Sequence, residues 1–189
     1  MAVLFDTSAL LLAMFPSAKP PADPATGQPV EHAHERITYL IERLSRARTP
    51  VLIPTPVLSE ILVNAGAGTQ QYVAKLSAHP FQLAPFDALA AVECADMLSK
   101  HGHKAPKSGA ASSARSKVKF DRQIVAIAKV RRAATIYSDD SDIHQYGIDC
   151  GIKVVRTFEL ELDPASNQKA LDFQTRVEPE GSGNAPEHS

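Results

Sequence analysis

Short apolar runs alternate with longer stretches of helical periodicity along most of this sequence. The runs at residues 2–5, 51–53, 81–84, 135–137 and 152–155 have the length and composition of buried strands. Between them, apolar positions recur at helical spacing, and prolines or glycines separate the segments. The alternation predicts an α/β domain in which a central, mostly parallel sheet of four to five strands has helices on both faces.

The helical segments are predicted from the same periodicity and from their end signals. Thr55 followed by Pro56 has the pattern of an N-cap with proline at the first helical position. A proline at position 50 ends the preceding helix before the second strand. The predicted helices cover residues 8–14, 30–48, 57–64, 69–77, 86–99 and 120–132.

Three segments lack this periodicity. Residues 16–29 are rich in proline, which excludes regular structure and predicts a long loop. Residues 101–117 are rich in glycine and serine, carry basic charge and contain no acid, so we expect a flexible basic loop. We place the domain at residues 1–160 and expect the polar stretch at 161–189 to be a disordered tail.

Composition narrows the class of protein without identifying a function. A chain of 189 residues with 44% hydrophobic and 22% charged residues fits one ordinary globular domain, and the net charge of −1 gives no general attraction to polyanions. Cys94 and Cys150 have no CxxC spacing, which argues against a disulfide framework or a zinc site and fits a reducing, cytoplasmic location. The apolar run 9–15 is too short for a membrane span and lacks a basic flank, so neither an export signal nor an anchor is expected.

Acidic residues follow two of the predicted strands at the point where each strand ends. Asp6 comes directly after the first strand, and Asp140 and Asp142 come shortly after the fourth. Because ligands bind beyond the carboxyl ends of the strands in open parallel sheets, these acids are expected at one edge. Glu60 and Asp121 lie near the starts of predicted helices that can reach the same edge.

Glu60 and Asp121 also lie beside apolar, core-facing positions of their helices, and neither has an obvious local Lys or Arg partner. Burying an unpaired carboxylate costs on the order of several kcal/mol. Acids brought together raise one another's pKa unless a cation neutralises them. A carboxylate-rich site suits Mg²⁺ or Mn²⁺, and such an ion can activate water against a phosphodiester without a nucleophilic side chain.

Four segments that carry these acids resemble the acidic motifs of PIN-domain nucleases, most closely those of the toxins of VapBC-type toxin–antitoxin pairs. They occur in the order and spacing of that family and together span nearly all of residues 2–156. The segments are residues 5–8, 57–62, 120–128 and 136–143.

The resemblance implies a PIN-like three-layer α/β/α sandwich and an endoribonuclease that depends on Mg²⁺ or Mn²⁺. It further implies a cognate antitoxin that holds the enzyme inactive, and a homodimer. One or two metal ions would be bound by four catalytic acids and one further acid, with two hydroxyl residues in support: Asp6, Glu60, Asp121 and Asp140; Asp142; and Ser138 and Thr7.

Each acid taken alone also has an ordinary structural interpretation. Asp6 could cap the helix that follows it, Asp121 could complement a helix dipole, and Glu60 could be a solvated edge residue. Asp139 is interpreted as an exposed loop charge, because its neighbour Asp140 fits the motif better. The metal-site hypothesis therefore depends on the acids occurring as a set.

Basic residues within and after residues 101–117 suggest how a nearly neutral protein could hold RNA, although a solvated linker explains them equally well. His101 and His103 have no further ligands nearby, so we do not expect zinc. The candidate phosphate contacts are Lys104, Lys107, Arg115, Lys117 and Lys119.

Two other functions are compatible with a sheet of this kind. A PIN-like domain can serve as an RNA-binding or assembly scaffold without a toxin role, usually after losing one or more of the acids, and all four are present here. A phosphatase of the haloacid-dehalogenase type needs a second aspartate two residues after the first, and that position is Ser8. Both rank below the nuclease.

Overall fold

The described residues form one central sheet of five parallel strands, in the order β3-β2-β1-β4-β5. The computed structural model describes residues 1–65, 68–100 and 111–164, and omits the side chains of residue 64 and of residues 111–119. All five predicted strands are present: β1 (Val3–Phe5), β2 (Val51–Pro54), β3 (Phe81–Ala84), β4 (Thr135–Tyr137) and β5 (Lys153–Val155).

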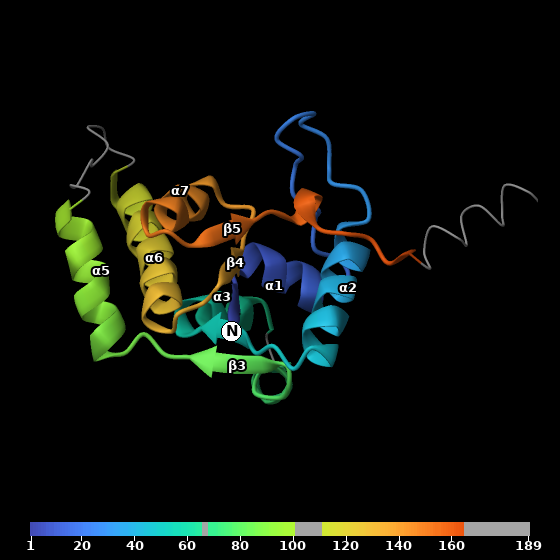
Figure 1. Ribbon diagram of the computed structural model, residues 1–189, viewed down its shortest axis with the longest axis horizontal. Coiled ribbons are helices and arrows are strands. Elements are labelled where there is room, and N and C mark those ends of the chain that lie inside the picture. The colour runs from blue at the N-terminus through green and yellow to red at the C-terminus, as the bar shows by residue number, and fades with distance from the viewer. Residues whose placement is uncertain (66–67, 101–110, 165–189) are drawn as a thin grey trace, which may run out of the picture.

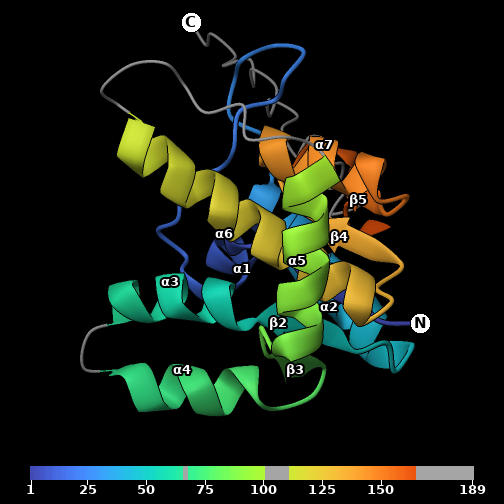
Figure 2. The same cartoon turned by 90° about the vertical axis from the view of Figure 1, so that its left-hand side faces the viewer.

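Helices cover both faces of this sheet. In Figure 1, α5 and α6 lie on one side of the strands and α1 and α2 on the other. Helix α6 packs against α5 and α7, whereas α1 packs against α2 and α3, which pairs with α4 (Figure 2). The predicted three-layer arrangement is confirmed. The helices are α1 (Thr7–Met14), α2 (Ala33–Arg46), α3 (Thr55–Ala65), α4 (Thr69–Leu76), α5 (Ala88–Lys100), α6 (Ala111–Val130) and α7 (Ser141–Asp149), followed by the 3₁₀ turn η2 (Thr157–Glu159).

The core lies where the sheet meets the two helical layers. Strand β1 is the middle strand and is fully buried, as is β2, because helices cover both of their faces. Leu10 of α1 and Ile124 and Ile127 of α6 fill the space against the sheet from the two layers. The core therefore fixes the ends of β1 and β4 relative to α1 and α6. Candidate acids follow the two strands, and another lies on α6.

Helix α7 was not predicted from the sequence. Gly147 lies within it, and glycine disfavours helix interiors by about 1 kcal/mol relative to alanine. The structure explains this glycine: a Cβ at position 147 would lie 2.3 Å from Cγ2 of Val154 on β5. The close approach of α7 to β5 requires glycine at this position. Because glycine disfavours helix, the same residue kept α7 from being predicted.

The basic loop predicted at residues 101–117 extends too far, because its last part is helical. Helix α6 begins at Ala111, so residues 111–117 are helical, while residues 101–110 lie outside the described part of the chain. The alanines near this start favour helix, and glycine and proline occur only before it. Most of the predicted tail, residues 165–189, also lies outside the description.

The proline-rich segment contains neither helix nor strand, as predicted. Ala22 and Pro29 form an isolated antiparallel bridge that closes a turn. His34 of α2 holds the beginning of the segment, because its ring nitrogens lie 2.9 Å from the carbonyl oxygen of Leu12 and 3.0 Å from that of Ala18. Among the described residues, no helix combines the length and apolar character that a membrane crossing requires.

Candidate metal centre

Five predicted site residues gather at the carboxyl edge of the sheet. Asp6 is the residue after β1, and Asp140 and Asp142 lie at the start of α7, after β4. Glu60 comes from α3 and Asp121 from the middle of α6. Helices α3 and α6 contact each other, so acids from both helical layers reach one place.

The described side chains around this edge form a hollow of about 610 Å³, which we call the acid hollow. Apolar side chains from α1 and α6, together with Thr7 and Ser8, line the rest of it. One ligand oxygen each from Asp121, Asp140 and Asp142 lies within 4.8 Å of the others, close enough to share a cation. The lining comprises Asp6, Thr7, Ser8, Leu11, Glu60, Phe120, Asp121, Ile124, Asp139 and Asp140.

Asp6 and Ser138 form the buried floor of this cluster. Asp6 is 5% exposed and Ser138 1%, and the Ser138 hydroxyl donates to Asp6 Oδ2 at 2.8 Å. The same hydroxyl oxygen accepts the backbone N–H of Asp140 at 3.1 Å. Asp6 occupies the N-cap position of α1, but its carboxylate makes no capping hydrogen bond. The capping interpretation of this acid is therefore wrong.

Burial raises the pKa of Asp6 from 3.8 to about 6. The hydrogen bond from Ser138 opposes the rise, and the negative charges of Asp140 and Glu60 add to it. Deprotonated Asp6 therefore lies in a low-polarity environment beside other acids, where a cation would stabilise it. The donors are all carboxylate oxygens, which fits Mg²⁺ or Mn²⁺ better than zinc or copper.

Glu60 differs from Asp6 in being exposed at the rim of the acid hollow. Its carboxylate accepts a hydrogen bond from the Thr7 hydroxyl, which connects α3 to the first residue of α1. The cluster therefore has a buried side at Asp6 and Asp121 and an open side at Glu60. A ligand can approach from the open side.

Asp140 has a second, structural role. It is the N-cap residue of α7, and its Oδ1 accepts the backbone N–H groups of Asp142 at 2.7 Å and Ile143 at 3.3 Å. One aspartate thus fixes the start of α7 and, with it, the position of Asp142 in the cluster.

Asp121 lies deep inside α6, ten residues after the helix begins at Ala111, and is 6% exposed. It is therefore no helix-terminal acid, and that interpretation is wrong. Its neighbour Arg122 is also buried, with its guanidinium carbon 4.9 Å from the ring centroid of Tyr146 on α7. This contact fixes α6 against α7, which keeps Asp121 beside Asp142.

Asp139 was wrongly interpreted as an exposed loop charge. It is half-buried, and its two carboxylate oxygens accept hydrogen bonds from the backbone N–H of Thr157 at 2.9 Å and from the Thr157 hydroxyl at 2.5 Å. Thr157 is itself 3% exposed. Asp139 therefore attaches the loop after β4 to the turn η2, while its neighbour Asp140 joins the acidic cluster.

Ser8 belongs to the site and was not singled out from the sequence. Its hydroxyl accepts the backbone N–H of Asp139 at 3.0 Å and lies 3.4 Å from Asp6 Oδ2. Its place two residues after Asp6 in a strand-to-helix turn was the available signal. The basic candidates remain undescribed: Lys104 and Lys107 lie outside the described residues, and of Arg115, Lys117 and Lys119 only the backbone, in the first turns of α6, is described.

The fold is similar to chains of known toxin–antitoxin complexes. A chain of VapBC2 from Rickettsia felis, bound to a promoter DNA fragment, matches with a TM-score of 0.54 and 14% identity over 82% of this chain and 98% of that one. A chain of DNA-bound VapBC from Salmonella typhimurium matches with a TM-score of 0.52 and 12% identity, over 83% of this chain and 98% of that one. A chain of a toxin–antitoxin complex from Klebsiella pneumoniae matches with a TM-score of 0.50 and 18% identity, over 84% of this chain and 100% of that one.

No protein-family model matches the sequence, and no curated protein matches it either. At 12–18% identity the similarity to the solved structures establishes the fold and nothing finer. The predicted PIN-like fold is confirmed.

Proposed function

We propose that this protein is a metal-dependent endoribonuclease of the VapC-like PIN family and the toxin of a type II toxin–antitoxin pair. The observation that carries the proposal is the convergence of acids from separate parts of the chain at one sheet edge, where a fold of this kind binds its ligands. The fold similarity to chains of VapBC complexes supports the same assignment.

The site residues would bind one or two Mg²⁺ or Mn²⁺ ions. Asp121, Asp140 and Asp142 are the ligands best supported by proximity, and Asp6 and Glu60 complete the set from the floor and the rim. Bound by these carboxylates, such an ion would supply Lewis acidity toward water and toward a phosphate oxygen.

The chain's own residues would position these carboxylates and shape the space for RNA. Ser138 holds Asp6 and the backbone of Asp140, and Thr7 holds Glu60. The apolar side chains of Leu11, Phe120 and Ile124 restrict water around the reacting groups. A hollow of about 610 Å³ has room for a phosphodiester and its adjoining sugar.

The test is an RNA cleavage assay with the purified 189-residue chain. We expect single-stranded RNA to be cut with Mn²⁺ or Mg²⁺ and left intact with EDTA. Asp121→Asn should slow cleavage by on the order of 100-fold, because it removes a charged ligand without changing side-chain shape. Asp96→Asn, which alters a partly exposed acid on α5 paired with Lys100, is the matched control and should cleave normally.

Other outcomes would reject the proposal in favour of a named alternative. RNA binding without cleavage in every metal would identify a scaffold. Hydrolysis of a small phosphomonoester with RNA left intact would identify a phosphatase.

The proposed partner is a small antitoxin encoded beside this chain, and the proposed assembly is a homodimer in the cytosol. We expect expression of the chain alone to arrest growth of a bacterial host, and co-expression of the neighbouring reading frame to relieve the arrest. The Asp121→Asn variant should be harmless by itself. Light scattering after gel filtration checks the dimer.

A further inference from the structure

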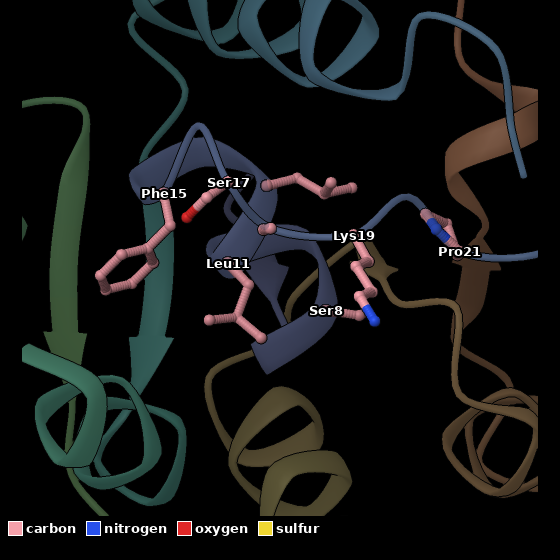
Figure 3. Close-up of a pocket in the computed structure, with 8 residues that line it drawn as sticks. Ser8, Leu11, Phe15, Ser17, Lys19 and Pro21 are labelled. Atoms are coloured by element: carbon pink, nitrogen blue, oxygen red, sulfur yellow. The ribbon is translucent and has the colours of Figure 1, made fainter.

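A second hollow of about 610 Å³ lies directly beside the acid hollow and shares Ser8 and Leu11 of α1 with it. Figure 3 shows how these two side chains extend from α1 into this space, with the beginning of the proline-rich segment forming the opposite wall. We call it the flanking hollow. Its lining comprises Ser8, Leu11, Leu12, Phe15, Ser17, Ala18, Lys19 and Pro21.

The walls of the flanking hollow combine a fixed apolar surface with one positive charge. Phe15 is held by stacking on Tyr72, with ring centroids 5.2 Å apart and planes inclined by 24°. Leu11 continues this apolar surface toward the acids. The side chain of Lys19 extends across the hollow toward Ser8 (Figure 3).

The charges of the two hollows complement each other. The described lining of the acid hollow includes five acids and neither Lys nor Arg, whereas Lys19 is the one charged residue in the described lining of the flanking hollow. If metal ions neutralise the acids, an RNA strand can place one phosphate in the acid hollow. The neighbouring phosphates of that strand then lie on either side of it. Lys19 is placed to contact one of them.

His34 holds the backbone next to this lysine, whose own side chain is exposed. Its two ring nitrogens contact the carbonyl oxygens of Leu12 on α1 and of Ala18, the residue before Lys19. The backbone that carries Lys19 is therefore attached to the same helix that separates the two hollows. The wall of the hollow at this point is therefore fixed backbone, from which the exposed Lys19 side chain extends.

We propose that the flanking hollow binds the nucleotide next to the scissile phosphate, with its base against Leu11 and Phe15 and a backbone phosphate on Lys19. The inference rests on the nuclease function proposed above and specifies how that site holds its substrate. An apolar and aromatic surface beside a cation is the usual arrangement for sequence-tolerant binding of single strands. Continuity with the acid hollow favours an RNA strand over a peptide as the occupant.

The test compares Lys19→Gln with Lys75→Gln, which removes an exposed lysine from α4, in steady-state cleavage of a short RNA with Mn²⁺. We expect Lys19→Gln to raise KM roughly fivefold with kcat within about twofold of wild type, and Lys19→Arg to restore KM. The slope of log(kcat/KM) against log[KCl] should become shallower by about 0.7, the change expected when one single-strand phosphate contact is lost. A purely structural role for Lys19 would leave that slope unchanged.

The base contact has its own test with substrates that carry an abasic residue at each position around the cleavage site. An abasic residue at one adjacent position should raise KM for wild type, and Phe15→Ala should abolish that difference. If wild type cleaves RNA but Lys19→Gln and Lys75→Gln behave alike, the flanking hollow is no RNA subsite and this inference is wrong. If wild type cleaves no RNA in any metal, the proposed function itself fails.

A further outcome assigns the hollow to another occupant. If Lys19→Gln leaves RNA kinetics unchanged and weakens binding of the co-expressed protein partner, the hollow is a protein-docking surface and the RNA proposal is overturned.

Discussion

The Ser138 hydroxyl lies 2.8 Å from Asp6 Oδ2 and is the hydrogen-bond donor that fixes this buried carboxylate. The same oxygen accepts the backbone N–H of Asp140 at 3.1 Å. One short side chain therefore sets the position of the acid after β1 relative to the acid after β4.

Replacing Ser138 should impair metal binding and stability together. We expect Ser138→Ala to weaken Mn²⁺ binding roughly 10-fold to 100-fold, because the orienting contact to Asp6 is lost. The free energy of unfolding should fall by about 1–3 kcal/mol, since a buried acceptor loses its donor. Calorimetric Mn²⁺ titration and denaturant unfolding measure the two effects. Ser138→Thr retains the hydroxyl and should retain metal affinity; equal affinity for Ser138→Ala and wild type would refute the role.

Asp140 allows its capping role and its metal role to be separated. Asp140→Asn and Asp140→Ala both remove the charge, so both should lose Mn²⁺ affinity. Asparagine caps helices about as well as aspartate and alanine does not, so without metal Asp140→Ala should be about 1 kcal/mol less stable than Asp140→Asn. Equal stability of the two variants in EDTA would contradict the cap seen at the start of α7.

The raised pKa of Asp6 predicts an unusual pH dependence of stability without metal. Because the pKa is about 6 in the folded protein and near 3.8 in the unfolded chain, the folded state keeps a proton that the unfolded chain has released. The stability that this retained proton gives to the folded state is therefore fully present below pH 3.8 and is lost as the pH rises through about 6. The total loss is about 3 kcal/mol.

The measurement uses Asp6→Asn, which is neutral at every pH and still offers Ser138 an acceptor. In EDTA, the free energy of unfolding of the variant minus that of wild type should rise by up to about 3 kcal/mol between about pH 4 and neutral pH. Saturating Mn²⁺ at neutral pH should stabilise wild type more than the variant. A difference between variant and wild type that stays constant with pH would show that Asp6 titrates normally.

Asp139 should behave as a structural residue despite its position next to Asp140. Asp139→Ala leaves the backbone and hydroxyl donors of buried Thr157 without their acceptors, so we expect a loss of about 2 kcal/mol in unfolding free energy. Mn²⁺ affinity should stay within roughly threefold of wild type. The opposite result, unchanged stability with metal binding abolished, would place Asp139 among the ligands.

The strands could be predicted because a sheet covered on both faces needs continuous apolar runs, and β2 is buried at every position. Asp6, Asp140 and Asp142 could be predicted together because they follow strand ends, which are visible in the sequence. Glu60 and Asp121 lie within helices, and their place in the set was predicted from the family's motifs. The start of α6 was missed because the serines around it favour turns and caps over helix interiors, and glycine and proline lie just before it, so the helix preference of its alanines was overlooked. Helix α7 was missed because packing against β5 demands a glycine inside it.

The roles of neighbouring side chains could not be read from the sequence. Asp139 and Asp140 have the same chemistry and adjacent positions, and only the path of the loop after β4 directs one to Thr157 and the other to the N-terminus of α7. The burial difference between Asp6 and Glu60 likewise depends on how α3 packs. Sequence spacing says which residues can meet, and packing decides which of them are desolvated.

The central position of β1 in the sheet has a consequence for folding during synthesis. Its neighbours in the sheet are β2 and β4, and Asp6 acquires its partner Ser138 from a point 132 positions further along the chain. During synthesis, the first strand emerges long before the fourth. Until β4 and the loop after it appear, the growing polypeptide cannot assemble the acidic cluster, so any catalytic activity arises only after residues up to Asp142 have left the ribosome.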